Sequence, residues 1–282
     1  MIPAIGFSLQ KQYNLPMSKI ISLLSEQGFS AVSPLWTPEL NVAELDACVK
    51  RHNMVIQSIH APHKDIALLW VPENERSYLV LLNVMKSIDD CARFAVPVLV
   101  VHGWQGLFYS FSEEKLNFAL FDQLVQYAET RGIFVAFENL EGEEYLEALM
   151  TRYRQQSNVG YCWDSGRDNC YPHKKDFLHT FGSRLIMTHL NDNFGLRHPN
   201  GIPSGDDDLH LLPYDGTIDW DKALLKLGKA PRQKILNFEL KTVSHSTRET
   251  DLIYANLSLE AFIAKAGERA RLIAEKYAKG LQ

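Results

Sequence analysis

The feature that most constrains the fold of this chain is an alternation of short apolar segments with longer amphipathic ones, at a period of roughly 30–40 residues. Eight segments rich in Val, Ile and Phe are predicted strands: Ala4–Ser8, Ala31–Pro34, Val55–His60, Val98–His102, Phe134–Glu138, Val159–Asp164, Leu185–Leu190 and Ile235–Glu239. Eight intervening segments are predicted helices: Ser18–Gln27, Val42–His52, Arg76–Phe94, Ser112–Arg131, Glu143–Gln155, Lys174–Phe181, Trp220–Leu227 and Arg248–Tyr277. Strands that alternate with helices indicate a parallel sheet in an α/β protein.

Eight strand–helix units in 282 residues predict that the sheet closes on itself. A (β/α)8 TIM barrel uses roughly 250 residues in one domain, so we expect residues 1–282 to form a single TIM-barrel domain. The alternative is an open doubly wound sheet, which would carry a Gly-rich turn after its first strand to bind a nucleotide. Here the first strand leads into Ser8-Leu9-Gln10-Lys11, so the barrel is the preferred prediction.

Composition narrows the class of protein further. Hydrophobic residues make up 46% and charged residues 22%, which is typical of a globular chain. The 29 basic and 34 acidic residues give a net charge of −5 without long runs of one sign, which disfavours a nucleic-acid partner. No apolar run approaches the ~20 residues of a membrane span. A start without basic residues and four cysteines without a C-x-x-C pair favour a reduced, cytoplasmic protein.

Six consecutive predicted strands end in a residue suited to metal binding or acid–base chemistry. These residues are His60, His102, Glu138, Asp164, His189 and Glu239. With 34 acidic residues and 10 histidines among 282, such a run is improbable by chance. TIM-barrel enzymes build their active sites at these strand ends. Two Glu, one Asp and one His form an oxygen-rich donor set that suits Mn²⁺, Mg²⁺ or Co²⁺ and accepts Zn²⁺.

A long segment follows the seventh predicted strand, from residue 191 to 217. Long loops of this kind in barrels usually carry function. It contains Asp208-Leu209-His210, a spacing that places two more ligand-type side chains on one side of an extended chain. We therefore expect Asp208 and His210 to join the strand-end residues.

Several motifs resemble those of one group of barrels. They are E-N at 138–139, W-D-S-G at 163–166, H-L-N-D at 189–192 and D-L-H-L-L-P-Y-D-G-T-I-D-W at 208–220. Together they resemble the sugar phosphate isomerase/epimerase group, the xylose isomerase-like TIM barrels, which also include the family-2 AP endonucleases. The resemblance runs from H-A-P at 60–62 to F-E at 238–239 and so covers nearly the whole chain.

The resemblance implies a metal-dependent sugar isomerase or epimerase. One divalent ion would be held by Glu138, Asp164, His189 and Glu239, with Mn²⁺ expected first and Mg²⁺, Co²⁺ or Zn²⁺ as alternatives. The catalytic acid–base pair would be Glu138 and Glu239, which move a proton beside a metal-polarised carbonyl. The partner would be a small sugar, a sugar phosphate or an inositol ketone, and the sequence leaves open whether the chain forms a homo-oligomer.

Seven residues are predicted to bind substrate: His60, His102, Trp104, Glu144, Arg167, Asp208 and His210. Glu144 falls where the epimerases of the group place a substrate-contacting Glu, and Trp104 would offer an aromatic face to a sugar. Arg167 stands where the group commonly has a His. A guanidinium there can bind a phosphate, a carboxylate or a sugar oxygen.

Two alternative functions remain at this point. The first is a multi-zinc phosphodiester hydrolase of the AP endonuclease type, whose ligands would be counterparts of all six strand-end residues and of Asp208 and His210, with one more His at the position of Arg167. Arg167 disfavours it, because arginine is not a metal ligand at neutral pH. The second is a barrel that binds a sugar without turnover, which the complete set of four predicted ligands disfavours.

Overall fold

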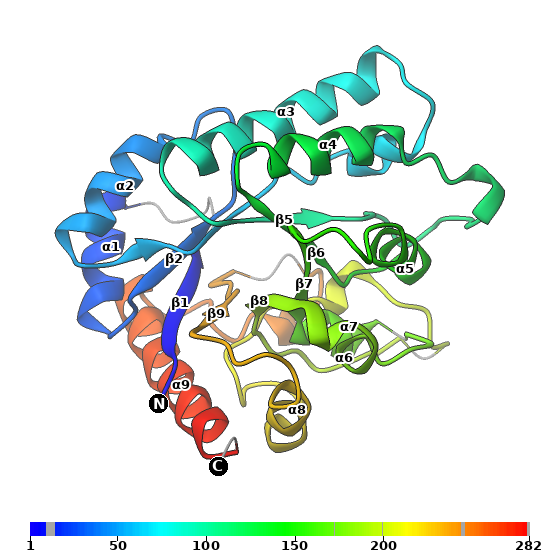
Figure 1. Cartoon of the computed structure of the whole chain (residues 1–282). Coiled ribbons are helices and arrows are strands. Elements are labelled where there is room, and N and C mark those ends of the chain that lie inside the picture. The colour runs from blue at the N-terminus through cyan, green and yellow to red at the C-terminus, as the bar shows by residue number, and fades with distance from the viewer. Residues whose placement is uncertain (10–14, 172, 199, 244–245, 281–282) are drawn as a thin grey trace.

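The computed structural model describes residues 1–9, 15–171, 173–198, 200–243 and 246–280. Gln10 and Lys11 of the first turn lie outside this part. The strands are β1 (Ala4–Leu9), β2 (Ala31–Pro34), β3 (Val55–Ile56), β4 (Ser58–His60), β5 (Val98–His102), β6 (Phe134–Glu138), β7 (Val159–Asp164), β8 (Leu185–His189) and β9 (Ile235–Phe238) (Figure 1). Their positions agree with the predicted strands to within a residue at either end, except between residues 55 and 60.

The predicted strand Val55–His60 is divided at Gln57, because this segment passes from one sheet to another. One sheet has the order β3-β2-β1-β9 and the other β4-β5-β6-β7-β8, and all neighbours in both are parallel. The Gln57 N–H still donates to the Val32 carbonyl of the first sheet, whereas the Ala61 N–H donates to Val100 of the second. One continuous strand was therefore the wrong expectation, although the segment holds the predicted place in the barrel.

The two sheets join at two seams and close the barrel. At the first seam Leu35 bridges to His60, and the Trp36 N–H donates to the His60 carbonyl at 2.9 Å. At the second, Leu190 bridges to Phe238, while the Thr188 hydroxyl accepts the Asn237 N–H at 3.1 Å. The predicted TIM-barrel fold is confirmed.

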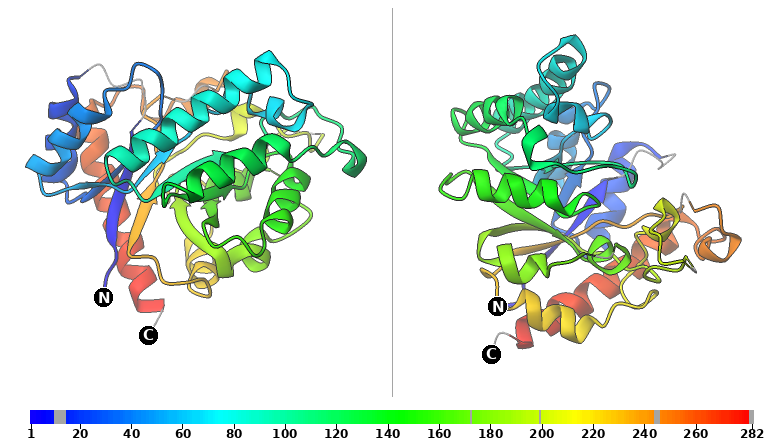
Figure 2. Two further views of the ribbon diagram at one scale, coloured as in Figure 1. Left: turned by 45° about the horizontal axis from the view of Figure 1, so that its top comes forward. Right: turned by 90° about the vertical axis from the view of Figure 1, so that its right-hand side faces the viewer.

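Helices form the outer layer around the strands (Figures 1 and 2). They are α1 (Met17–Glu26), α2 (Val42–Arg51), α3 (Glu75–Arg93), α4 (Ala119–Glu129), α5 (Glu143–Arg152), α6 (Ser165–Cys170), α7 (Phe177–Phe181), α8 (Trp220–Leu227) and α9 (Leu259–Gly280). Short 3-10 turns occupy Ile66–Trp70, Glu113–Lys115, Gly182–Arg184, Gly205–Asp207 and Glu249–Asp251.

Three predicted helices begin later than expected, and in each case a polar side chain marks the true start. The predicted helix Arg248–Tyr277 begins at Leu259, where the Ser258 hydroxyl accepts the Ala261 N–H at 3.2 Å. The helix expected from Ser112 begins at Ala119, and Asn117 accepts its first N–H at 3.0 Å. The helix expected from Lys174 begins at Phe177, behind the Asp176 cap. The hydrophobic pattern continues through the turns that precede these helices, whereas the capping side chains fix the residue at which each helix begins.

The apolar face of α9 is buried, including Phe262, Ile263 and Ile273. This helix contacts β1, α1 and α8, so the face covers the barrel. The four cysteines are also buried and unbridged, as their spacing predicted. No helix within the described residues has the length and hydropathy to cross a bilayer.

The barrel interior differs between its two sheets. Side chains alternate along a strand, so the residues two positions before the strand-end groups also face inward. In the five-stranded sheet the inward positions of β5 to β8 hold an apolar cluster of Val98, Val100, Ala136, Cys162 and Met187, whereas β4 has the buried Ser58. In the four-stranded sheet Asn237 donates its side-chain amide to the Ser8 hydroxyl at 2.7 Å, so the interior there is polar.

Candidate functional site

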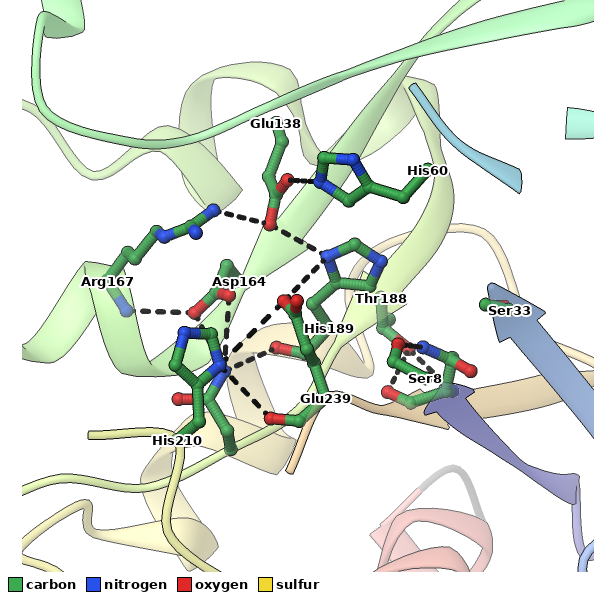
Figure 3. Close-up of polar contacts among 12 residues, drawn as sticks. Ser8, Ser33, His60, Glu138, Asp164, Arg167, Thr188, His189, His210 and Glu239 are labelled. Carbon is green, nitrogen blue, oxygen red and sulfur yellow. Dashed lines mark hydrogen bonds and ion pairs between the residues drawn. The ribbon is translucent and has the colours of Figure 1, made fainter. Parts of the chain in front are cut away.

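Four strand-end side chains converge at the carboxyl-terminal mouth of the barrel (Figure 3). Glu138, Asp164 and His189 are the last residues of β6, β7 and β8, and Glu239 directly follows β9. One potential ligand atom from each lies within 4.8 Å of every other, and all four residues are buried. Three carboxylates and one imidazole at one point fit a divalent metal ion.

His189 connects the two glutamates. Its Nδ1 lies 2.7 Å from Glu138 Oε1 and 3.2 Å from Glu239 Oε2. Burial opposes a charge on His189, but Cys162, Glu138 and Glu239 together hold its pKa well above the usual value. Both carboxylates therefore approach one nitrogen, although they come from β6 and β9, which are separated around the barrel by β7 and β8.

The carboxyl pKa values in the cluster diverge. Burial would raise the pKa of Glu138, but His189 and Arg167 hold it well below its usual range. His189 and His210 do the same for Glu239, again against burial. At Asp164 the effect of burial outweighs that of the nearby Arg167 and raises the pKa to about 7. Two of the carboxyl groups are thus held as anions, whereas the third keeps a proton until near neutral pH.

Asp164 is fixed by the residues of the recognised motifs. Its backbone N–H donates to the Asn139 side-chain carbonyl at 2.8 Å, and its carboxylate accepts both the Arg167 N–H at 2.8 Å and the Asn191 amide at 3.0 Å. A Cβ on Gly166 would stand 1.8 Å from Asn191 Oδ1, so only glycine fits there. The E-N, W-D-S-G and H-L-N-D motifs therefore form one support for this carboxylate.

The long segment after β8 is anchored by Asp192 of the H-L-N-D motif. Its carboxylate accepts the Tyr214 and Ile218 N–H groups and the Trp220 indole N–H, at 3.0, 3.1 and 2.9 Å. A bridge between Asp192 and Leu211 adds two backbone hydrogen bonds. This anchoring returns Asp208 and His210 to the site, as their spacing predicted.

Three histidines line another side of the mouth. His60 Nε2 lies 3.0 Å from His102 Nε2, and both nitrogens approach Glu138 Oε2, at 3.3 and 3.1 Å. Burial holds the pKa of His102 well below its usual value. The third is His63, which is not among the predicted site residues and whose ring stacks on His102 at 4.9 Å. Its position three residues after His60 was the available signal.

The side chain of Arg167 lies between the strand-end residues and the returning loop. Its Nη1 is 2.9 Å from Glu138 Oε1 and its Nε is 3.3 Å from Asp208 Oδ2, with 8% of the residue exposed. The same Asp208 oxygen lies 3.2 Å from His210 Nε2. His210 and Arg167 hold the pKa of Asp208 well below its usual range despite burial. Arg167 is therefore paired with two carboxylates of the site.

A cavity of about 370 Å³ opens over these groups. Of the predicted site residues, its lining includes His60, His102, Arg167, Asp208 and Glu239. Lining residues that sequence analysis missed are Ser8, Ser33, His63, Glu141, Tyr171 and Lys241. Small residues such as Ser8 and Ser33 carry no sequence signal for a cavity, because their role depends on the barrel that surrounds them.

Two of the predicted substrate residues, Trp104 and Glu144, are not among the residues that line the cavity. The Trp104 ring stacks on Tyr145 with centroids 4.2 Å apart, and its indole N–H donates to the Gly106 carbonyl. Glu144 accepts the Tyr109 hydroxyl at 2.6 Å. Substrate contact by Trp104 and Glu144 stays a prediction.

Comparisons with known proteins agree with this fold. The family model described as xylose isomerase-like TIM barrel matches residues 21–259. An uncharacterised protein, y4fM of Sinorhizobium fredii, is 27% identical over 93% of this chain and 94% of its own length.

Solved structures give the same result at lower identity. The IOLI protein with a bound zinc atom superposes with a TM-score of 0.74 at 16% identity, over 97% of this chain and 99% of its own. The D-psicose 3-epimerase of Clostridium cellulolyticum H10, solved with D-tagatose, gives 0.71 at 12% identity over 99% of both chains. At such identities the superpositions establish the fold alone.

Proposed function

The chain belongs to the xylose isomerase-like TIM barrel family, and from this we propose that it is a metal-dependent isomerase or epimerase of a sugar, sugar phosphate or inositol ketone. The observation that carries the proposal is the convergence of Glu138, Asp164, His189 and Glu239 within 4.8 Å at the barrel mouth. The neighbouring folds include a zinc-bound protein and a sugar 3-epimerase, which supports this class of chemistry.

The four converging side chains would hold one divalent ion. Mn²⁺ is our first expectation, because three carboxylates and one imidazole form an oxygen-rich set, and Mg²⁺, Co²⁺ and Zn²⁺ are alternatives. When bound, such an ion supplies Lewis-acid polarisation of a substrate carbonyl. The protein holds the carboxylates in place through Asn139, Asn191 and Arg167, so the ligands are ordered before an ion arrives.

Glu138 and Glu239 would move the proton. Their low pKa values keep both as carboxylates, the form that accepts a proton from the carbon next to the carbonyl. If one glutamate removes the proton and the other takes up a proton from solvent and delivers it to the opposite face, the product is an epimer. If the proton returns to the adjacent carbon, the product is an aldose–ketose isomer.

The cavity suits a small polar substrate. Its volume of about 370 Å³ lies near the lower end of ligand sites, which run from roughly 300 to 1,000 Å³. His60, His102, Asp208 and Arg167 face it with hydrogen-bonding groups, and Lys241 adds a positive charge. His210 lies behind Asp208, where it supports that carboxylate.

Metal analysis followed by a substrate screen tests the proposal. One divalent ion per chain, together with solvent deuterium incorporated beside the carbonyl of a ketose or ketose phosphate, is the expected result. Two or three zinc ions with cleavage of abasic DNA would replace it by the hydrolase hypothesis. Absence of any ion after reconstitution, with sugar bound but unchanged, would favour a non-catalytic barrel.

A further inference from the structure

We propose that Arg167 is a resident cation that takes the place of a second metal ion and so limits the site to one. The inference rests on the proposed metal dependence of the four-residue cluster. The inference goes beyond that proposal because it names the residue that sets the number of ions. Its evidence is the position of the Arg167 guanidinium.

The guanidinium of Arg167 is surrounded by metal-ligand types of side chain. Its Nη1 lies 2.9 Å from Glu138 Oε1 and 3.4 Å from His102 Nε2, and its Nε lies 3.3 Å from Asp208 Oδ2. Two carboxylates and an imidazole from three separate segments thus contact one buried cation. Removal of the guanidinium would leave the two carboxylates and the imidazole without this cation.

Donor sets for a second ion exist on this side of the mouth. His60, Glu138 and His189 offer ligand atoms that lie within 4.8 Å of one another, and so do His60, His63 and His102. Missing ligands therefore do not limit the site to one ion. Arg167 contacts one member of each set, Glu138 at 2.9 Å and His102 at 3.4 Å, and its own backbone N–H donates to Asp164 at 2.8 Å.

The charges of the buried site favour the same conclusion. Glu138, Asp164, Asp208 and Glu239 can carry four negative charges when all are ionised. One divalent ion and one guanidinium bring the sum to one negative charge, and a second divalent ion beside the guanidinium would change it to one positive charge. Uncompensated charge in a buried site is strongly unfavourable. A neutral residue at position 167 would leave two negative charges beside one ion, a deficit that a second ion would fill.

Equilibrium dialysis of the purified chain against Zn²⁺ alone and Mn²⁺ alone, followed by elemental analysis, tests this inference. We expect one ion per wild-type chain and a rise to two in Arg167→Gln and Arg167→His. Arg167→Lys keeps the positive charge and should stay at one. The matched control is Arg197→Gln, because Arg197 also pairs with an aspartate, Asp251, by two hydrogen bonds but away from the cluster; it should stay at one.

The outcomes separate this inference from the proposed function. One ion in the wild type and one in folded Arg167→Gln and Arg167→His would overturn the role of Arg167 alone. No ion in the wild type would overturn the metal dependence, and the inference with it. A wild-type chain that takes up two ions at saturating Zn²⁺ would also overturn the inference, without need of any variant. Circular dichroism shows which variants fold, and His102→Ala in the Arg167→Gln background should lose the second ion.

Discussion

The two sheets of the barrel contribute different kinds of residue to the site. Each strand of the β4-β5-β6-β7-β8 sheet ends in an ionisable residue, namely His60, His102, Glu138, Asp164 and His189. The β3-β2-β1-β9 sheet leads into Glu239 and otherwise presents Ser8 and Ser33 to the cavity. Beneath the rim the five-stranded sheet is apolar on β5 to β8, with Val100, Ala136 and Met187, whereas the four-stranded sheet is polar.

This difference shows how one barrel provides both rigid ligands and room for a substrate. Close-packed apolar residues below the ionisable rim hold the ligands in place and exclude water, which strengthens electrostatic interactions at the rim. Small hydroxyl residues in the other sheet leave the volume that the cavity occupies. We therefore expect changes in the five-stranded sheet to affect chemistry and metal binding, and changes at the small residues of the four-stranded sheet to affect substrate affinity.

The largest expected effect comes from the acid–base pair, whose members come one from each sheet. Glu138→Gln and Glu239→Gln should each lower kcat by about 10²–10⁴-fold, because an amide cannot accept the proton. Steady-state kinetics with the substrate found in the screen measures this. Glu129→Gln, on the outer helix α4, is the control and should keep wild-type activity. Full activity in either site variant would remove that glutamate from the mechanism.

A matched pair of truncations tests the apolar and polar interiors. Met187 and Asn237 lie two residues before His189 and Glu239 on neighbouring strands, and both are fully buried. Met187→Ala should cost about 2–5 kcal/mol of unfolding free energy, since it opens a cavity among close-packed side chains. Asn237→Ala should cost about 1 kcal/mol, because it loses one hydrogen bond to Ser8 but also removes a buried carbonyl oxygen without a partner. Denaturant titration measures both, and equal costs would contradict the contrast between the interiors.

Metal removal should destabilise the protein, because the ion would bind only the folded state, in which the four ligands converge. Chelation from a holoprotein held at a metal concentration of one hundred times Kd would remove about 2.7 kcal/mol of stabilisation. Thermal unfolding with and without chelator measures the shift. Asp164→Asn, which loses one anionic ligand, should show a smaller difference between the two conditions. A chelator effect as large in this variant as in the wild type would place the ion elsewhere.

Local sequence predicted the elements well but could not predict how distant segments meet. The strand ends at His60, Glu138 and Asp164 follow from short apolar runs, and strand direction places their side chains at one mouth. The division at Gln57 depends on pairing with Val32, a residue of another strand, so periodicity within the segment cannot predict it. The helix expected from Arg248 failed for a local reason, because an apolar pattern continued through a capped turn.

Prediction of the site was limited in the same way, because the sequence shows residue types but not contacts between distant segments. The ligand types were visible one residue at a time, and the D-x-H spacing indicated Asp208 and His210. The pairing of Arg167 with Glu138 and Asp208 was not visible, because it requires the loop after β8 to fold back over α6. The sequence did not predict Ser33 as a site residue either, since the role of a buried serine depends on the cavity that it lines.

The smallest expected effect is on substrate affinity and comes from a substitution in the four-stranded sheet. It tests the comparison between the two sheets most directly. Ser33 is buried, lines the cavity and accepts the Ser58 hydroxyl at 2.9 Å. Ser33→Leu would fill part of the substrate volume and should raise KM about tenfold, equivalent to about 1.4 kcal/mol, with an unchanged metal content. Ser33→Ala keeps the volume and should leave KM near that of the wild type. If Ser33→Leu lowers the metal content instead, the two sheets are coupled through the site, and the separation of ligand support from substrate room is wrong.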